Sequence, residues 1–186
     1  MVLLSTATLA AVASLTQQPA ALPPPVPQSL RAEHQAIHDE LDGATLLPGP
    51  VGTAARELTR VLHPHFVRED EIALPPLGLL APLARGEFTP EMLAVLPLTD
   101  ALRAELPRML EEHEAIRAAT LRLAEVARAA GNERVVRLAA TLAQHALSEE
   151  ELFYPAAVLV GDLVRARAAG PQAPPAGRVV ATPAGP

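Results

Sequence analysis

Histidine and glutamate recur in this sequence at the spacing of one helical turn. His65 precedes Glu69 by four residues, and His145 precedes Glu149 by four residues. Residues four apart on an α-helix lie on the same face one turn apart, so each pair can approach a single ion. Imidazole nitrogens suit iron, copper, zinc and nickel, and carboxylates can bridge two ions. The pattern therefore indicates metal binding.

Both pairs belong to a longer internal repeat. Residues 33–37 (EHQAI) match residues 112–116 (EHEAI) at an offset of 79, and the two His-x3-Glu pairs are offset by 80. Self-similarity of this length is typical of a duplicated structural unit. Each unit would be a helical hairpin with one histidine on its first helix, His34 or His113. Two such hairpins facing each other would bring histidine and glutamate from four helices to one axis.

The spacing of the histidines along each helix decides which of them are predicted to be metal ligands. His38 follows His34 by four residues and lies on the same helical face, whereas His63 must point away from His65 and should be exposed. Two cations in a dry core need anionic partners, which glutamates supply. The alternative carboxylates, five residues after each histidine, are Asp70 and Glu150. The predicted metal ligands are His34, His38, His65, Glu69, His113, His145 and Glu149.

Composition predicts that helices position these residues. Aromatic residues make up only 2% of the chain, while Ala, Leu, Arg and Glu dominate its middle. We expect Ser29 and Thr89 to be N-caps, residues 42–43 to stop the first helix, and Gly131-Asn132 to join two helices. The expected fold is an all-α, up-down-up-down four-helix bundle built from two pseudo-repeated helical hairpins. The expected helices span about 29–41, 53–74, 99–130 and 133–167.

The remainder of the chain is predicted to lie outside the bundle. Residues 1–28 are uncharged and then Pro-rich, which predicts a flexible segment, and residues 169–186 read as a disordered Pro/Ala/Gly-rich tail. The bundle itself is assigned to residues 29–168. The apolar run 2–15 is too short to cross a membrane and lacks the basic region of a secretory signal, so we expect a cytoplasmic protein without a membrane partner.

Charge excludes one class of partner. The net charge is −6, and all 21 acidic residues lie between Glu33 and Asp162. An acidic core without a basic stripe argues against nucleic-acid binding.

The ordered set of motifs resembles the hemerythrin family, also called the HHE cation-binding domain. The resemblance covers about residues 29–160 and rests on His34, His65-x3-Glu69, His113, and His145 with Glu149 or Glu150. It implies two iron ions bridged by an oxo or hydroxo group and by two carboxylates, with oxygen bound at the less-liganded iron in an apolar pocket. Residues that flank the ligands and could line such a pocket are Phe66, Leu142 and Ala146.

One departure from the family pattern concerns the third helix. Oxygen-carrying members usually bear two histidines four apart there, but Arg117 stands four residues after His113. If the hairpins are equivalent, His38 could fill that place from the opposite side.

These features favour a protein that binds oxygen or another diatomic ligand for sensing, carriage or protection. The alternatives are a di-iron enzyme of peroxide or nitric oxide defence, an iron-handling protein, and a bundle without metal. The first three share one metal site, so the sequence leaves open whether the protein is an enzyme, and no catalytic residue is predicted.

Overall fold

The computed structural model describes residues 24–170, and all of its regular structure is helical. No strand occurs within this range, so the prediction of an all-α fold is confirmed. Two π-helical turns, Glu69–Ala73 and Glu149–Phe153, and two 3₁₀ segments, Pro75–Leu79 and Pro90–Val95, lie between the α-helices. The α-helices are α1 (Gln28–Thr45), α2 (Gly49–Arg68), α3 (Leu80–Ala84), α4 (Leu96–Ala129), α5 (Glu133–Ser148) and α6 (Tyr154–Ala168).

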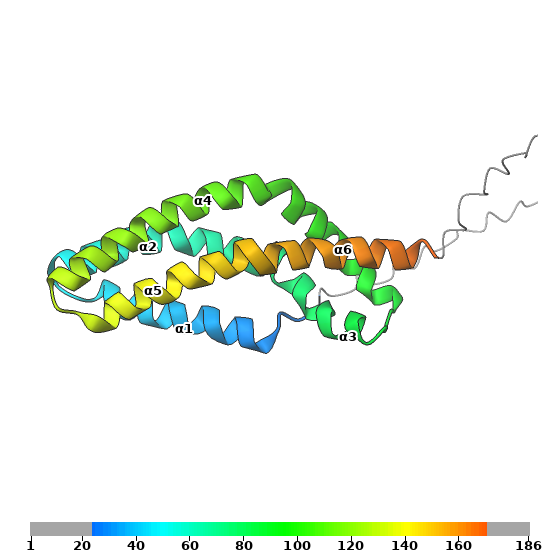
Figure 1. Cartoon of the computed structure of the whole chain (residues 1–186), viewed down its shortest axis with the longest axis horizontal. Helices are drawn as coiled ribbons and strands as arrows, with labels where there is room; N and C mark the ends of the chain where they lie inside the picture. Colours follow the sequence, from blue (N-terminus) through cyan, green and yellow to red (C-terminus); the bar gives the residue numbers. More distant parts are fainter. Residues whose placement is uncertain (1–23, 171–186) are drawn as a thin grey trace, which may run out of the picture.

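Four of these helices surround a common core. α1 packs against α2 and α5, and α4 packs against the same two helices. The four therefore form a closed ring, which is the arrangement of a four-helix bundle. α4 runs along most of the long axis, and α5 continues through its π-helical turn into α6 (Figure 1). The two 3₁₀ segments pack against α6 at the opposite end of the molecule from the α4–α5 connection.

The first helix is longer than predicted at both ends. It begins at Gln28 after Pro27, so Ser29 is not its N-cap, and it continues through residues 42–43 to Thr45. A glycine in a helix costs about 1 kcal/mol relative to alanine. That cost is offset here because Leu41 and Ala44 are buried in the core on either side of Gly43. Thr89 precedes a 3₁₀ segment as expected, but its side chain makes no capping hydrogen bond.

The predicted boundary between the last two bundle helices is confirmed. Gly131 has a φ of 66°, a left-handed conformation that glycine adopts without strain. Asn132 then caps α5, because its side-chain oxygen accepts a hydrogen bond from the Val135 amide at 3.2 Å. The chain thus reverses in two residues and places α5 directly beside α4.

A polar layer crosses the bundle between two apolar clusters. On α1, His34 lies between Leu30 of one cluster and Ile37 of the other. On α4, His113 lies between Met109 and Ile116 in the same way. Ile37 and Ile116 belong to the cluster between α1, α2, α4 and α5, and Leu30 and Met109 to the cluster toward α6. The packing therefore excludes water from both sides of the histidine layer.

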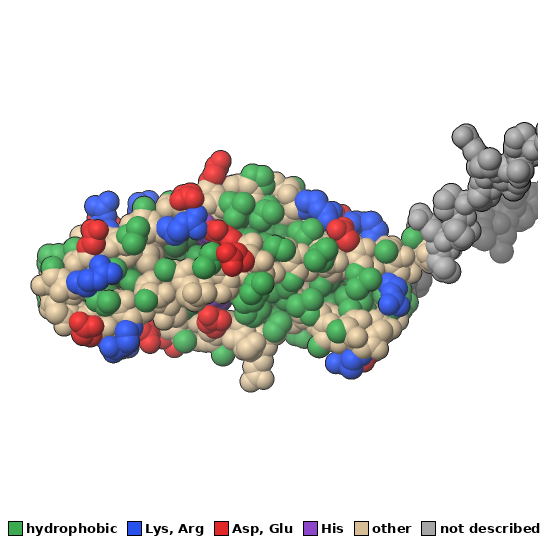
Figure 2. Space-filling view, in the orientation of Figure 1, with side chains coloured by type: hydrophobic (Ala, Val, Ile, Leu, Met, Phe, Trp, Pro, Cys, Tyr) green, Lys and Arg blue, Asp and Glu red, His purple; other side chains and the backbone are tan. Residues whose placement is uncertain are grey.

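The surface in Figure 2 carries exposed hydrophobic side chains over α6. Leu159 and Leu163 of α6 are exposed, and so is Leu152 in the π-helical turn that precedes it. No helix within residues 24–170 is both long and apolar enough to cross a membrane. The predictions for residues 1–23 and 171–186 concern segments outside the described residues.

Candidate metal centre

Six of the predicted ligands come together in the middle of the bundle. The four histidines come from four different helices: His34 from α1, His65 from α2, His113 from α4 and His145 from α5. The two carboxylates lie one turn beyond His65 and His145. All six are buried, with exposed fractions of 5% or less. Buried glutamate charges need positive partners nearby, which protonated histidines or a cation can provide.

The first group of donor atoms joins α2 and α4. The Nε2 atoms of His65 and His113 lie 2.8 Å apart. Glu69 Oε1 lies 3.4 Å from His65 Nε2, and Glu149 Oε2 lies 3.4 Å from His113 Nε2. Ligand atoms of these four residues all lie within 4.8 Å of one another. This group could hold one metal ion.

The second group joins α1 and α5 and shares a residue with the first. Glu149 Oε1 lies 2.8 Å from His145 Nε2 and 3.5 Å from His34 Nε2. Glu69 Oε2 lies 4.0 Å from His34 Nε2. Each glutamate therefore directs one oxygen toward each histidine pair.

The two glutamates occupy equivalent places in the backbone. Glu69 and Glu149 each open a π-helical turn, and their carbonyl oxygens accept hydrogen bonds from the amides of Leu74 and Tyr154, five residues later. π-helical turns within α-helices occur frequently at functional sites. The wider turn changes which of the following residues face the bundle axis.

Several of the clustered atoms lack a hydrogen-bond partner within the described chain. Both ring nitrogens of His34 are such atoms, as is Glu69 Oε2. A buried polar atom without a partner costs about 1–3 kcal/mol. The facing nitrogens and oxygens among them are ordinary ligands of a divalent cation, so the residues present fit a metal site.

The family model of the hemerythrin HHE cation-binding domain matches residues 26–157. The chain belongs to this family. The searches of curated proteins and of solved structures found no match. The clustered histidines and glutamates all lie within the matched residues, and they could hold a cation.

Outer carboxylates orient the histidines of the HHE domain. The carboxylate of Glu112 lies 2.9 Å from His65 Nδ1, and that of Glu150 lies 2.7 Å from His113 Nδ1. A carboxylate can only accept these hydrogen bonds, so Nδ1 carries the hydrogen and Nε2 is left for a metal.

The other two histidines face outer carboxylates without forming a hydrogen bond to them. His145 Nδ1 lies 3.2 Å from Glu33, and His34 Nδ1 lies 3.7 Å from Asp70. The second donor group is therefore less firmly oriented than the first.

These contacts distinguish the two carboxylates that the sequence left open on each helix. Glu69 and Glu149, four residues after a histidine, face the core. Asp70 is exposed and Glu150 is half-buried, and each contacts the outer nitrogen of a histidine on another helix. In this structure the residues at a spacing of four are the inner donors.

The inner histidines hold protons strongly when no cation is present. Burial lowers the pKa of His65, but the carboxylates of Glu69 and Glu112 outweigh it and raise the pKa to about 9. Burial likewise lowers the pKa of His145, while Glu149 raises it, again to about 9. Protons and metal ions therefore compete for these nitrogens, and metal affinity should rise with pH.

The two inner glutamates are affected in opposite directions. Burial, together with the charge of Glu149, raises the pKa of Glu69. Burial acts in the same direction on Glu149, but hydrogen bonds from His113 and His145 outweigh it and hold the pKa well below its usual range. The proximity of two carboxylates in a dry core thus favours one charge over two until cations are added.

The sequence reasoning missed Tyr154, which contacts the first donor group. Its hydroxyl donates to Glu69 Oε1 and lies 3.3 Å from His65 Nε2 and 3.2 Å from His113 Nε2. Burial, with the charges of the glutamates, raises its pKa, so the hydroxyl keeps its hydrogen in the metal-free protein. In a continuous α-helix, a residue nine positions after His145 would lie about two and a half turns away, on the opposite face. The π-helical turn redirects it inward.

His38 does not join the cluster. Among the described residues, neither group of close donor atoms includes it. Its ring packs edge-on against Phe66 at 5.0 Å and against His63 at 5.9 Å. Phe66 also stacks on His34 at 4.4 Å and so occupies the space beside that histidine. His63 is exposed, as predicted.

A small cavity borders the donor groups. Its volume is about 10 Å³, and its lining includes His65, His113, His145 and Glu149. The apolar side is formed by Leu62, Phe66, Ile116, Leu142 and Ala146. The three residues predicted to line an oxygen pocket are therefore among its walls. A cavity of this size has room for about one water-sized molecule.

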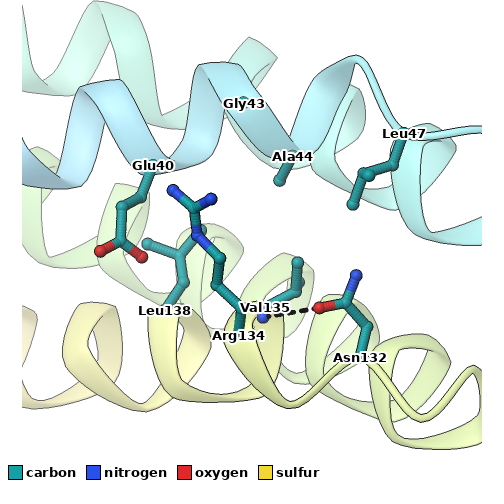
Figure 3. Close-up of a pocket in the computed structure, with 8 residues that line it drawn as sticks. All are labelled: Glu40, Gly43, Ala44, Leu47, Asn132, Arg134, Val135 and Leu138. Carbon is teal, nitrogen blue, oxygen red and sulfur yellow. Dashed lines mark hydrogen bonds between the residues drawn. The ribbon is translucent and has the colours of Figure 1, made fainter.

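A larger pocket lies elsewhere, between α1 and the start of α5 (Figure 3). Its volume is about 80 Å³, and its lining includes Glu40, Leu47, Asn132 and Arg134. Glu40 is six residues beyond His34 on α1, about 9 Å along the helix. This pocket contains no residue of the donor groups.

Proposed function

We propose that this protein binds two iron ions and, at them, oxygen or another diatomic ligand. The observation that carries the proposal is that two groups of inward-facing donors share Glu149. The proposed ligands are His34, His65, Glu69, His113, His145 and Glu149. His38 is left out because it packs against Phe66 instead.

Two ions account for the donor arrangement better than one. Glu149 faces His113 with one oxygen and His145 with the other. Glu69 likewise lies between His65 and His34. Each carboxylate thus faces one histidine of each donor group. Carboxylates in such positions suit bridging between two ions, as in known di-metal sites of helical bundles. Two carboxylates do not neutralise the charge of two iron ions. An oxo or hydroxo bridge would offset the remaining positive charge.

Iron is the proposed metal because of the family and the ligand types. Imidazole with carboxylate suits iron, and the chain has no cysteine to favour a softer site. Bound iron would supply the electrons and the open coordination position that a diatomic ligand needs. The chain's own residues orient the ligands through outer carboxylates and exclude water with apolar clusters on either side.

The proposal includes an up-down bundle of two repeated hairpins. The outer contacts support it, because the contact of His65 with Glu112 corresponds to that of His145 with Glu33 under the repeat offsets. The contact of His34 with Asp70 corresponds in the same way to that of His113 with Glu150.

The cavity supports a small ligand of low polarity. Its volume of about 10 Å³ has room for about one water-sized molecule, which is too little for an organic substrate. Phe66, Leu142 and Ala146 form an apolar wall beside three imidazoles, which suits a ligand that binds iron without hydrogen-bonding to the protein.

Metal content and an optical spectrum test the function. Ferrous iron is added anaerobically to the full chain, iron per chain is counted, and oxygen is then admitted and removed. We expect about two irons per chain and a visible absorption that appears with oxygen and fades under vacuum. Glu149→Gln should lose iron, whereas Glu151→Gln, on the exposed side of the same turn, should keep it. No bound iron in a folded wild-type protein would refute the proposal.

The diatomic ligand has its own test. Ala146→Val narrows the cavity without removing a donor atom, so iron content should stay at the wild-type value while oxygen or nitric oxide binds at least about tenfold more weakly, a loss of about 1.4 kcal/mol. Irreversible oxidation of the wild-type iron by oxygen would instead favour the enzyme or the iron-handling alternative.

A further inference from the structure

Tyr154 is buried where the first donor group converges. Only 1% of its surface is exposed, although its hydroxyl is polar. The hydroxyl oxygen is in contact with Glu69 Oε1 and lies 3.3 Å and 3.2 Å from the Nε2 atoms of His65 and His113. One phenol oxygen therefore touches three of the four residues in that group.

These distances are the spacing of ligands around one ion. Donors at adjacent positions of an ion with bonds of about 2.0–2.2 Å lie roughly 3 Å apart. The Nε2 atoms of His65 and His113 are 2.8 Å apart, and Glu69 Oε1 is 3.4 Å from His65 Nε2. The phenol oxygen falls in the same range from both nitrogens.

We propose that Tyr154 is a metal ligand, the fifth protein donor to the ion held by His65, His113, Glu69 and Glu149. This inference rests on the proposed metal centre. Coordination replaces the phenolic hydrogen with the ion, and that hydrogen leaves as a proton to solvent. In the metal-free protein the same hydrogen is donated to Glu69, which keeps the oxygen aimed at the site.

The repeat indicates that Tyr154 does more than fill space. Under the offset of 80, the residue of the first hairpin that corresponds to Tyr154 is Leu74. Leu74 is fully buried and belongs to the same apolar cluster as Tyr154, so an alkyl side chain satisfies the packing at that position. The phenol in the second hairpin adds an oxygen that packing does not require.

The two metal positions consequently differ. The ion near His65 and His113 has five protein donors, whereas the ion near His34 and His145 has only those two nitrogens and the facing oxygens of Glu69 and Glu149. The second position keeps more sites for an exogenous ligand. Because each helix pair supplies two histidines, this difference arises from Tyr154 rather than from the histidine count.

Tyrosine bound to ferric iron can be detected directly, since it produces a charge-transfer absorption and resonance-enhanced ring vibrations. Tyr154 is the only tyrosine in the sequence, so any such signal is assigned without a variant. The full chain is loaded with iron, oxidised, and examined by resonance Raman spectroscopy with ordinary and ring-deuterated tyrosine. We expect phenolate modes that shift on deuteration and vanish in Tyr154→Phe, with iron content retained.

The outcomes separate this inference from the proposed function. Two bound irons without phenolate modes would overturn the assignment of Tyr154 while leaving the metal centre intact. A chain that binds no iron, seen from metal analysis, would overturn both. If Tyr154→Phe fails to fold, the deuteration shift in the wild-type protein still decides the question.

Discussion

Removing the metal ions should lower the thermal midpoint of this protein by at least about 4 °C. Two inner donor atoms, Nε2 of His34 and Oε2 of Glu69, have no hydrogen-bond partner and no ionic contact shorter than 3.5 Å within residues 24–170. At about 1–3 kcal/mol for each buried unpartnered atom, they destabilise the metal-free protein by about 2–6 kcal/mol. The lower figure corresponds to roughly 4–8 °C at about 2–4 °C per kcal/mol for a chain of this size.

The assay is thermal unfolding followed by circular dichroism, with the protein either chelated or loaded anaerobically with ferrous iron. Excess free metal must be held constant, because stabilisation by a bound ligand grows with its concentration. Glu149→Gln serves as the control, since it keeps the shape of the side chain but removes the charge shared by both groups. Its midpoint should change little when iron is added.

A metal-free protein that melts within about 2 °C of the loaded protein would refute the reasoning, because the unpartnered atoms would then carry no appreciable cost. An equal rise in Glu149→Gln would place the stabilising ions outside the cluster.

Three further results are expected. His38→Ala should retain the wild-type iron content by metal analysis; loss of one iron would restore this histidine to the ligand set. Glu150→Gln, which removes the carboxylate oxygen next to His113 Nδ1, should weaken metal binding by about 10–100-fold in a competition titration. Glu114→Gln should not, although Glu114 also pairs with Arg117. Finally, the free energy of unfolding of the metal-free protein should be highest below pH 6.5 and fall as the pH rises toward 9. The reason is that His65 and His145 have folded-state pKa values of about 9, above their usual 6.5, so folding favours their protonated forms by on the order of 3 kcal/mol each. Denaturant titrations at several pH values check the slope, and a stability that rises over this range would contradict it.

The helical content and the positions of the histidines follow from local pattern. Four-residue spacing fixes the face of a helix, so spacing alone is enough to place His65 with Glu69 and His145 with Glu149. Gly131-Asn132 is sufficient to locate the turn into α5, because both residues act within a few positions of themselves. The predicted end of α1 is wrong because burial of Ala44 overrides the local stop signal at residues 42–43.

Contacts between helices decide what spacing cannot. Their spacing alone makes Asp70 and Glu150 possible metal ligands. The packing of the helices shows instead that they contact the outer Nδ1 nitrogens of His34 and His113. His38 shares a face with His34, but the ring of Phe66 from α2 packs against it.

The sequence by itself determined the family, the all-α fold, and a set of histidines and glutamates suited to a cation. The tertiary structure alone decided that Tyr154 reaches this set, because a π-helical turn changes the direction of every residue after it. Periodic spacing describes one uninterrupted helix. Which atoms meet at the centre depends on where helices widen and on what their neighbours place beside them.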